Sequence, residues 1–284
     1  MKHSRAFTLV ELIIVIAVSS VVAIMISTIL SRPMQGLVDQ SRRSALVDMA
    51  TVALDRMARD IRLAVPNSLR LSGACVSGGA NCRVELLRAQ IGGRYRASPD
   101  ASNVRRDPPT CAASPCTVEV LSPFNGTDQA LMSTINWMVI YNVGGSEAGS
   151  NVWPNGSATG PAVVSPKVAV TLTSSNALSL SGSGVAGFSF KYASPQHRFY
   201  LADKVVGYDC AGGALRRQEF TSLAATGDYN YSAAAPLASG VSACVFRYDP
   251  GTARRNGLIT LQLTLAKGGE QITLMKQVHV DNAP

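Results

Sequence analysis

The stretch RAFTLVELIIVIAVSSVVAIMISTIL, residues 5–30, is apolar almost throughout. Its only charged residues are Arg5 at the start and Glu11 six residues later. As a helix, the 24 residues of 7–30 would be about 36 Å long, which is enough to cross a bilayer core of about 30 Å. We therefore expect residues 7–30 to form a single transmembrane helix.

Glu11 needs an explanation, because a carboxylate in the middle of a membrane costs about 2.5–3.5 kcal/mol on insertion scales. Two explanations are open from the residues alone. Glu11 lies near the start of the span, and a charge at the headgroup boundary costs less. Alternatively, Glu11 meets a cation inside an apolar bundle, which removes the penalty of an unpaired buried charge.

A cleavable secretory signal is a weaker reading of this segment, because its apolar core has about 7–15 residues and no carboxylate. Orientation does not follow from the flanking charges: Lys2 and Arg5 precede the span, and three arginines follow it at 32, 42 and 43. All six cysteines come after the span. An even number of cysteines in loop-rich sequence predicts disulfides in an oxidising compartment, and therefore a head outside the cytoplasm.

After the span the sequence predicts an amphipathic stem helix over 31–66, followed by a β-rich head over 67–284. One apolar stripe recurs every three or four residues, and its members are Leu46, Met49, Ala53, Met57 and Ile61. Asp55–Arg59 is an i,i+4 ion-pair candidate. Most charged side chains are expected off the stripe, namely those of Asp48, Asp55, Arg56, Arg59, Asp60 and Arg62. Pro33 and Gly36 should kink or locally unwind the helix, and Pro66 should end it.

Beyond residue 67 the apolar spacing changes to a period of two, which indicates strands. LITLQLTLA and QITLMKQVHV flank KGGE, where Gly268–Gly269 supplies the positive φ angles of a tight hairpin. Residues 92–115 and 144–161 are expected to be long exposed loops. Further strands are expected at 84–88, 117–122, 135–143, 163–173, 177–181, 188–192 and 241–248. The predicted fold class is α+β.

The N-terminal stretch resembles the processing site of type IV prepilins and type II secretion pseudopilins. That family has a short basic leader, a small residue, and then Phe-Thr-Leu-x-Glu opening an apolar helix. Here the leader is residues 1–6, Phe7 opens the helix, and Glu11 has the matching position. Ala6 stands where the family usually has Gly. Residues 32–70, the segment ACVFRYDPG (243–251) and the ending HVDNAP (279–284) are similar to minor pilins of the PilW and J-pseudopilin type.

The resemblance implies cleavage between Ala6 and Phe7 by a prepilin peptidase on the cytoplasmic face, followed by N-methylation of Phe7. It also implies that Glu11 meets the free N-terminal amine of a neighbouring subunit during subunit assembly. The implied partners are the peptidase, other major and minor pilins, and the inner membrane. The implied location is a single-pass inner-membrane protein with a periplasmic head that can reach the pilus tip.

The cysteines favour three disulfides over a metal site. Cys111-x4-Cys116 has tolerable ligand spacing for zinc, but Cys75-x6-Cys82 does not, and no histidine lies near either. Of the 15 pairings that six cysteines allow, we favour the following three: Cys75–Cys82, Cys111–Cys116 and Cys210–Cys244.

No catalytic, metal or cofactor site stands out, so we expect a protein that is not an enzyme. Gly182–Gly187 fits G-x-G-x-x-G but precedes a strand pattern rather than a helix, which indicates a turn. His197 and His279 lack partners at motif spacing. The loop aspartates lack the oxygen pattern of a calcium loop; they are Asp100, Asp107, Asp128 and Asp249.

The formal charge of +8 is spread along the chain, which argues against a nucleic-acid groove. A local basic loop could touch DNA or an acidic polysaccharide, although a solvated loop is the simpler interpretation; its arginines are Arg94, Arg96, Arg105 and Arg106. The function classes that remain are a minor pilin, a type II secretion pseudopilin, a pilus-tip adhesin and a membrane-tethered enzyme. The last explains neither Glu11 nor its spacing from Phe7.

We predict that the mature chain begins at N-methylated Phe7. Cleavage removes Lys2 and Arg5, which takes the formal charge from +8 to +6. Mass spectrometry of the N-terminal peptide measures both the start and the added methyl group. An intact Met1, or a mature start near Ser31, would contradict the prediction.

Overall fold

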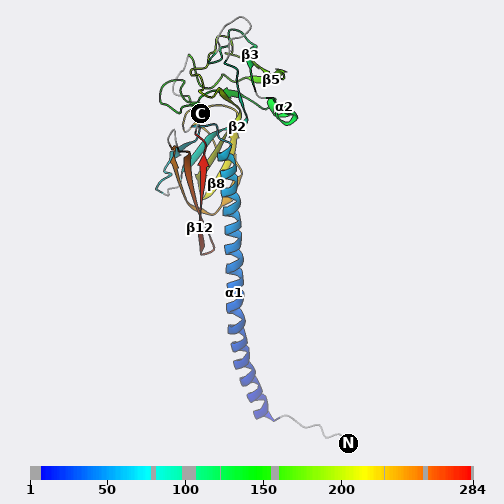
Figure 1. Cartoon of the computed structure of the whole chain (residues 1–284). Coiled ribbons are helices and arrows are strands. Elements are labelled where there is room, and N and C mark those ends of the chain that lie inside the picture. The colour runs from blue at the N-terminus through cyan, green and yellow to red at the C-terminus, as the bar shows by residue number, and fades with distance from the viewer. Residues whose placement is uncertain are drawn as a thin grey trace.

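The computed structural model shows one long helix that carries a β-rich head at its C-terminal end (Figure 1). The prediction of an α+β fold is confirmed. The structure describes residues 8–77, 81–97, 107–121, 123–154, 160–226, 228–251 and 255–282, without the side chains of residues 28 and 30–35.

Helix α1 runs without interruption from Leu9 to Arg62. The unwinding expected at Pro33 and Gly36 is therefore wrong, and Figure 1 shows only a gentle curve along the helix. A proline removes one i→i−4 hydrogen bond and crowds the preceding turn. The described residues on either side of this turn are exposed, so the helix can absorb the disturbance by bending.

The helix ends four residues before Pro66 because the chain leaves it to pair with a strand. Leu63 is the C-cap. The Val65 N–H donates to the Leu87 carbonyl at 2.8 Å, and the Ala89 N–H donates to the Leu63 carbonyl at 2.7 Å. Tertiary pairing therefore sets the boundary that the proline was expected to set.

Within the described residues, the head has three antiparallel sheets and one short helix. The largest sheet has the order β1-β2-β7-β8-β9, with β4 also paired to β7. The other two have the orders β10-β11-β12 and β3-β6-β5. The bounds are β1 Arg70–Gly73, β2 Cys82–Arg94, β3 Cys116–Glu119, α2 Gly126–Met132, β4 Trp137–Val139, β5 Ala169–Ser174, β6 Ala177–Ser181, β7 Arg198–Ala211, β8 Ala214–Phe220, β9 Pro236–Ser239, β10 Val241–Asp249, β11 Gly257–Lys267 and β12 Glu270–Val280.

Strands β2 and β7 connect the two lobes of the head. They pair from Cys82↔Cys210 at one end to Arg94↔Arg198 at the other. One end lies in the stem lobe, with β8, β12 and the end of α1, and the other lies in the distal lobe, with β3, β5 and α2 (Figure 1).

Strands β7 and β8 were not predicted from the sequence. Strand β7 is buried on both faces over much of its length, and the buried acids Asp203 and Asp209 interrupt its apolar pattern. The signal that could have found this hairpin is the turn Gly212–Gly213, where both φ angles are positive at 59° and 71°.

The C-terminal hairpin is confirmed, with φ angles of 62° and 88° at Gly268 and Gly269. The strand expected at 188–192 is wrong, because this segment makes only isolated bridges at Ser189 and Phe190. Its alternation arises because Phe188 and Phe190 pack edge to face, with ring centroids 5.0 Å apart. Of the other expected strands, 84–88, 177–181 and 241–248 fall inside β2, β6 and β10, whereas 117–122, 135–143 and 163–173 are only partly strand.

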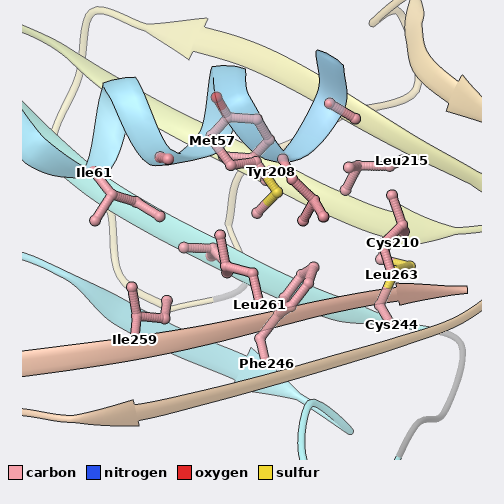
Figure 2. Packing of buried hydrophobic residues seen from close by; sticks show 14 of the residues in the cluster. Met57, Ile61, Tyr208, Cys210, Leu215, Cys244, Phe246, Ile259, Leu261 and Leu263 are labelled. Carbon is pink, nitrogen blue, oxygen red and sulfur yellow. A yellow bond between two sulfur atoms is a disulfide. The ribbon is translucent and has the colours of Figure 1, made fainter. Parts of the chain in front are cut away.

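The inward face of α1 forms the core of the stem lobe. Four members of the predicted stripe are buried, and Met49 is half-buried. Figure 2 shows Met57 and Ile61 directed at strand side chains such as Phe246 of β10 and Leu261 of β11. Each large side chain buried in this way contributes about 1.5–3 kcal/mol.

Asp60 is also buried, at 3% exposure, so its expected place off the stripe is wrong. It follows Ala53 by seven residues and therefore faces the same way. The Tyr208 hydroxyl and the Arg217 Nε both donate to Asp60 Oδ2 at 2.6 Å. Burial raises the pKa of Tyr208. Helix α1 is thus joined to β7 and β8 by a buried polar contact.

Arg217 also connects Asp60 to a network of charged side chains on the sheet, centred on Glu219. Glu219 accepts hydrogen bonds from Arg217 at 2.8 Å, Lys204 at 2.8 Å and Arg88 at 3.0 Å. Although partial burial acts in the opposite direction, the hydrogen bonds from Lys204 and Arg217 lower the pKa of Glu219 to about 2.

The expected Asp55–Arg59 pair is replaced by a contact between the stem and the sheet. Asp55 pairs with Lys276, which β12 places beside the helix. The hydrogen bond from Lys276 lowers the pKa of Asp55.

Three disulfides join the cysteines in the favoured pairs, Cys75–Cys82, Cys111–Cys116 and Cys210–Cys244. The first two close short loops, with sequence separations of 7 and 5. The third spans 34 residues and links β7 to β10, two different sheets. In the chain-entropy model a loop of that size contributes about 3–4 kcal/mol.

The two expected exposed loops are irregular and exposed over most of their described residues, but each contains buried side chains. Residues 92–94 belong to β2, and Tyr95 is fully buried. In the second loop Trp153 is 6% exposed, and its Nε1 donates to the Ser68 carbonyl at 2.9 Å. Residues 98–106 and 155–159 of these loops lie outside the described residues.

Asp60→Asn should lower the free energy of unfolding by about 2–4 kcal/mol, because Arg217 and Tyr208 lose their buried charged partner. Urea unfolding of the full chain in detergent measures this loss. Asp55→Asn is the matched control on the same helix, and its exposed ion pair should contribute far less. Equal losses in the two variants would contradict the buried role of Asp60.

Glu219 should make stability fall in acid. Its folded pKa lies below the ordinary value of 4.5, so its contribution is complete above about pH 4.5 and is lost as the pH falls toward 2. Between pH 7 and pH 3 the wild type should lose about 1–2 kcal/mol more than Glu219→Gln, after allowance for solvent screening. Glu119→Gln, which removes an exposed pair with Arg96, should retain the wild-type pH dependence.

Candidate assembly site

Thr8 fixes the start of α1. The Glu11 N–H donates to the Thr8 Oγ1 at 3.3 Å, and the Glu11 and Leu12 N–H groups donate to the Thr8 carbonyl. An N-cap hydroxyl of this kind satisfies a backbone donor that has no partner inside the helix. The helix therefore begins at Leu9 and holds Glu11 in its first turn.

Glu11 is exposed. A carboxylate in the first turn is favoured by the helix dipole by about 0.3–1 kcal/mol. Within the part of the chain that the structure describes, no side chain donates to this carboxylate. The geometry is compatible with both explanations of Glu11, a boundary charge and a carboxylate available to a second chain.

The surrounding surface is apolar on every side. Residues Leu9–Ser27 have a mean hydropathy of 2.9, and none is buried in the chain. Leu9 and Ile24 are 75% and 66% exposed. Figure 1 shows this half of α1 projecting away from the head. Such a surface requires lipid or other helices around it, and its length is sufficient to cross a membrane.

The two processing residues, Ala6 and Phe7, lie outside the described residues. The structure therefore does not test cleavage after Ala6 or N-methylation of Phe7, and both stay predictions. Thr8 and Glu11 are the first parts of the motif that the structure describes.

Residues 1–27 match the family model of the prokaryotic N-terminal methylation motif. The N-terminal segment of the chain is type IV prepilin-like. This motif implies processing by a prepilin peptidase, a membrane anchor and pilin partners in general. The prepilin-like segment includes Ala6, Phe7 and Glu11 together with the apolar helix. No curated protein and no solved structure matches the chain.

The glycine motif and the described loop aspartates have structural roles in turns, a helix cap and an ion pair. Gly182–Gly187 forms turns between β6 and the bridges that follow. Asp128 completes a capping box with Asn125 at the start of α2, and Asp249 pairs with Arg255. Asp100 lies outside the described residues. Among those that the structure describes, no group of three or more His, Cys, Asp or Glu side chains is placed to hold a metal ion.

His197 has an acidic neighbour that the sequence did not reveal. Its Nε2 lies 3.6 Å from Asp107 Oδ2, and Asp107 Oδ1 accepts a hydrogen bond from Tyr95 at 2.8 Å. The hydroxyl of nearby Ser194 accepts from the Arg198 N–H, and Ser194 is 1% exposed. The cluster therefore fixes three backbone segments and presents no accessible nucleophile. His279 lies exposed on β12.

Proposed function

We propose that the chain is a minor pilin of the type of the MSHA pilus biogenesis protein MshO, which takes part in the initiation or assembly of a type IV pilus. The observation that carries the proposal is a fully exposed apolar helix with one carboxylate in its first turn, within a methylation motif. The similarity of residues 32–70, 243–251 and 279–284 to minor pilins supports the finer assignment.

In this proposal Glu11 selects and aligns the neighbouring subunit. Cleavage after Ala6 creates an ammonium group at Phe7, four residues before Glu11. When apolar helices bundle, that ammonium and the carboxylate both leave water, and each needs the opposite charge. The Glu11 carboxylate of one chain therefore pairs with the Phe7 amine of its neighbour, and the pair sets the axial position of the two helices.

The proposed location is the inner membrane, crossed once, with the head in the periplasm and access to the pilus tip. Three disulfides within the head support an oxidising compartment for this part of the chain. The stem from Leu46 onward packs into the head. The membrane half and the head are therefore parts of one continuous rod.

The role that we propose is structural and not enzymatic. A type II secretion minor pseudopilin is the near alternative, because it uses the same anchor and the same assembly logic. The neighbouring genes, for a pilus or for a secretion system, separate the two.

A tip adhesin is favoured by one observation. A cavity of about 480 Å³ lies in the distal lobe, with Trp153, Phe188 and three prolines among its lining; none of the described residues that line it is charged. Its size and its aromatic lining suit a small neutral ligand.

Glu11→Val should abolish incorporation into the pilus while membrane insertion and leader cleavage persist. The neighbour's Phe7 ammonium would be left without its partner, a loss of about 3–5 kcal/mol when fully desolvated. Pilus counts by electron microscopy and immunoblots of sheared pili measure incorporation, and mass spectrometry of the N-terminus confirms processing.

Ser19→Val is the matched control, because it removes a polar group from the same exposed helix half and leaves the charge in place. It should assemble normally, and Glu11→Asp should be intermediate because its carboxylate reaches less far. Normal piliation with Glu11→Val would overturn the pairing role and leave the boundary explanation.

A further inference from the structure

Two arginines face each other at the end of the β2–β7 ladder. Arg94 and Arg198 are direct partners in the register, so their side chains project from the same face of the sheet. Like charges directly opposite each other are destabilising. The register thus concentrates positive charge at one point on the surface.

A hollow of about 350 Å³ adjoins this pair. It is lined by Gly92, Gly93, Arg94, Arg198, Phe199 and Tyr200. Gly92 is the direct partner of Tyr200, and a Cβ at Gly92 would lie 3.8 Å from the tyrosine ring. The hollow therefore has a floor of glycine backbone, one aromatic wall and a basic end.

The groups around the hollow favour one anionic group. Within the described residues, no carboxylate lies at ion-pair distance from Arg198, and the Tyr200 hydroxyl lies beside its guanidinium. Burial raises the pKa of Tyr200, so the phenol stays protonated and can donate a hydrogen bond. Asp281 lies close enough to act on Tyr200, which limits the positive potential.

We propose that this hollow binds a carboxylate or sulfate group of an acidic saccharide. A guanidinium matches either group through paired N–H donors, and the sugar ring can lie over Gly92 and Gly93 against the Tyr200 ring. A nucleic acid fits less well, because it needs several phosphate contacts in a row. The next arginine, Arg96, is already paired with Glu119 at 3.4 Å.

The inference concerns a different part of the molecule from Glu11 and does not depend on the pilus role. Residues 94 and 96 belong to the basic loop noted in the sequence. Arg198, more than 100 residues later, joins it only through the pairing of β2 with β7.

The test is calorimetric titration of the full chain in detergent with oligogalacturonate, at low and moderate salt. We expect saturable binding that weakens with salt, and at least tenfold weaker binding in Arg198→Gln. Tyr200→Phe should weaken binding less, and Asp281→Asn should strengthen it because a nearby negative charge is removed. Arg247→Gln is the matched control, since Arg247 is an exposed arginine on β10 and should bind like the wild type.

Three parallel titrations identify the source of the anion. Methyl-esterified oligogalacturonate, which lacks the charge, should not bind, and inorganic phosphate and sulfate should bind at least tenfold more weakly than the oligosaccharide. Equal affinity for free phosphate would overturn the saccharide assignment. If single-stranded DNA binds more tightly than oligogalacturonate, and Arg198→Gln abolishes that binding, the saccharide assignment is overturned in favour of a nucleic acid. An unchanged affinity in a folded Arg198→Gln variant, checked by its unfolding midpoint, would overturn the site itself.

Discussion

The last four turns of α1 belong to the hydrophobic core of the head and at the same time form the base of the projecting helix. Leu46, Ala53, Met57 and Ile61 are buried against strands from two sheets. Without these contacts the sheets would lose one side of their core, and the apolar half of the helix would have no rigid support. The head and the anchor are therefore coupled by the packing of one helix face.

A polar contact inside this interface defines the position of the helix. Apolar side chains alone tolerate small rotations and shifts, because hydrophobic burial is not directional. Asp60 must satisfy both Tyr208 and Arg217 in a buried place, and a buried charge that loses its partner is strongly destabilising. This requirement allows one rotation and one height of α1 on β7 and β8.

The same helix is built for two solvents. Its first half exposes apolar side chains in every direction, whereas its second half has one apolar face and one polar face. Burial against the head begins at Leu46, and the helix has no break between its two halves. A continuous rod can transmit the position of the membrane half, where Glu11 lies, to the disulfide-bonded head.

Residue patterns alone predicted the apolar helix, the position of Glu11, the change from helical to strand spacing, the C-terminal hairpin and the favoured cysteine pairs. Apart from the Cys210–Cys244 pair, which spans 34 residues, each of these follows from local periodicity, turn chemistry or short separations along the chain. Four features became clear only from the folded chain: the end of α1, the burial of Asp60, the central place of β7 and the pairing of Arg94 with Arg198. Those features depend on pairing between segments far apart in the sequence. From the sequence alone, a charged residue is predicted to be exposed unless its distant partner is known. Residue spacing shows which secondary structure a segment favours by itself. Contacts with distant segments determine where the folded chain departs from that preference.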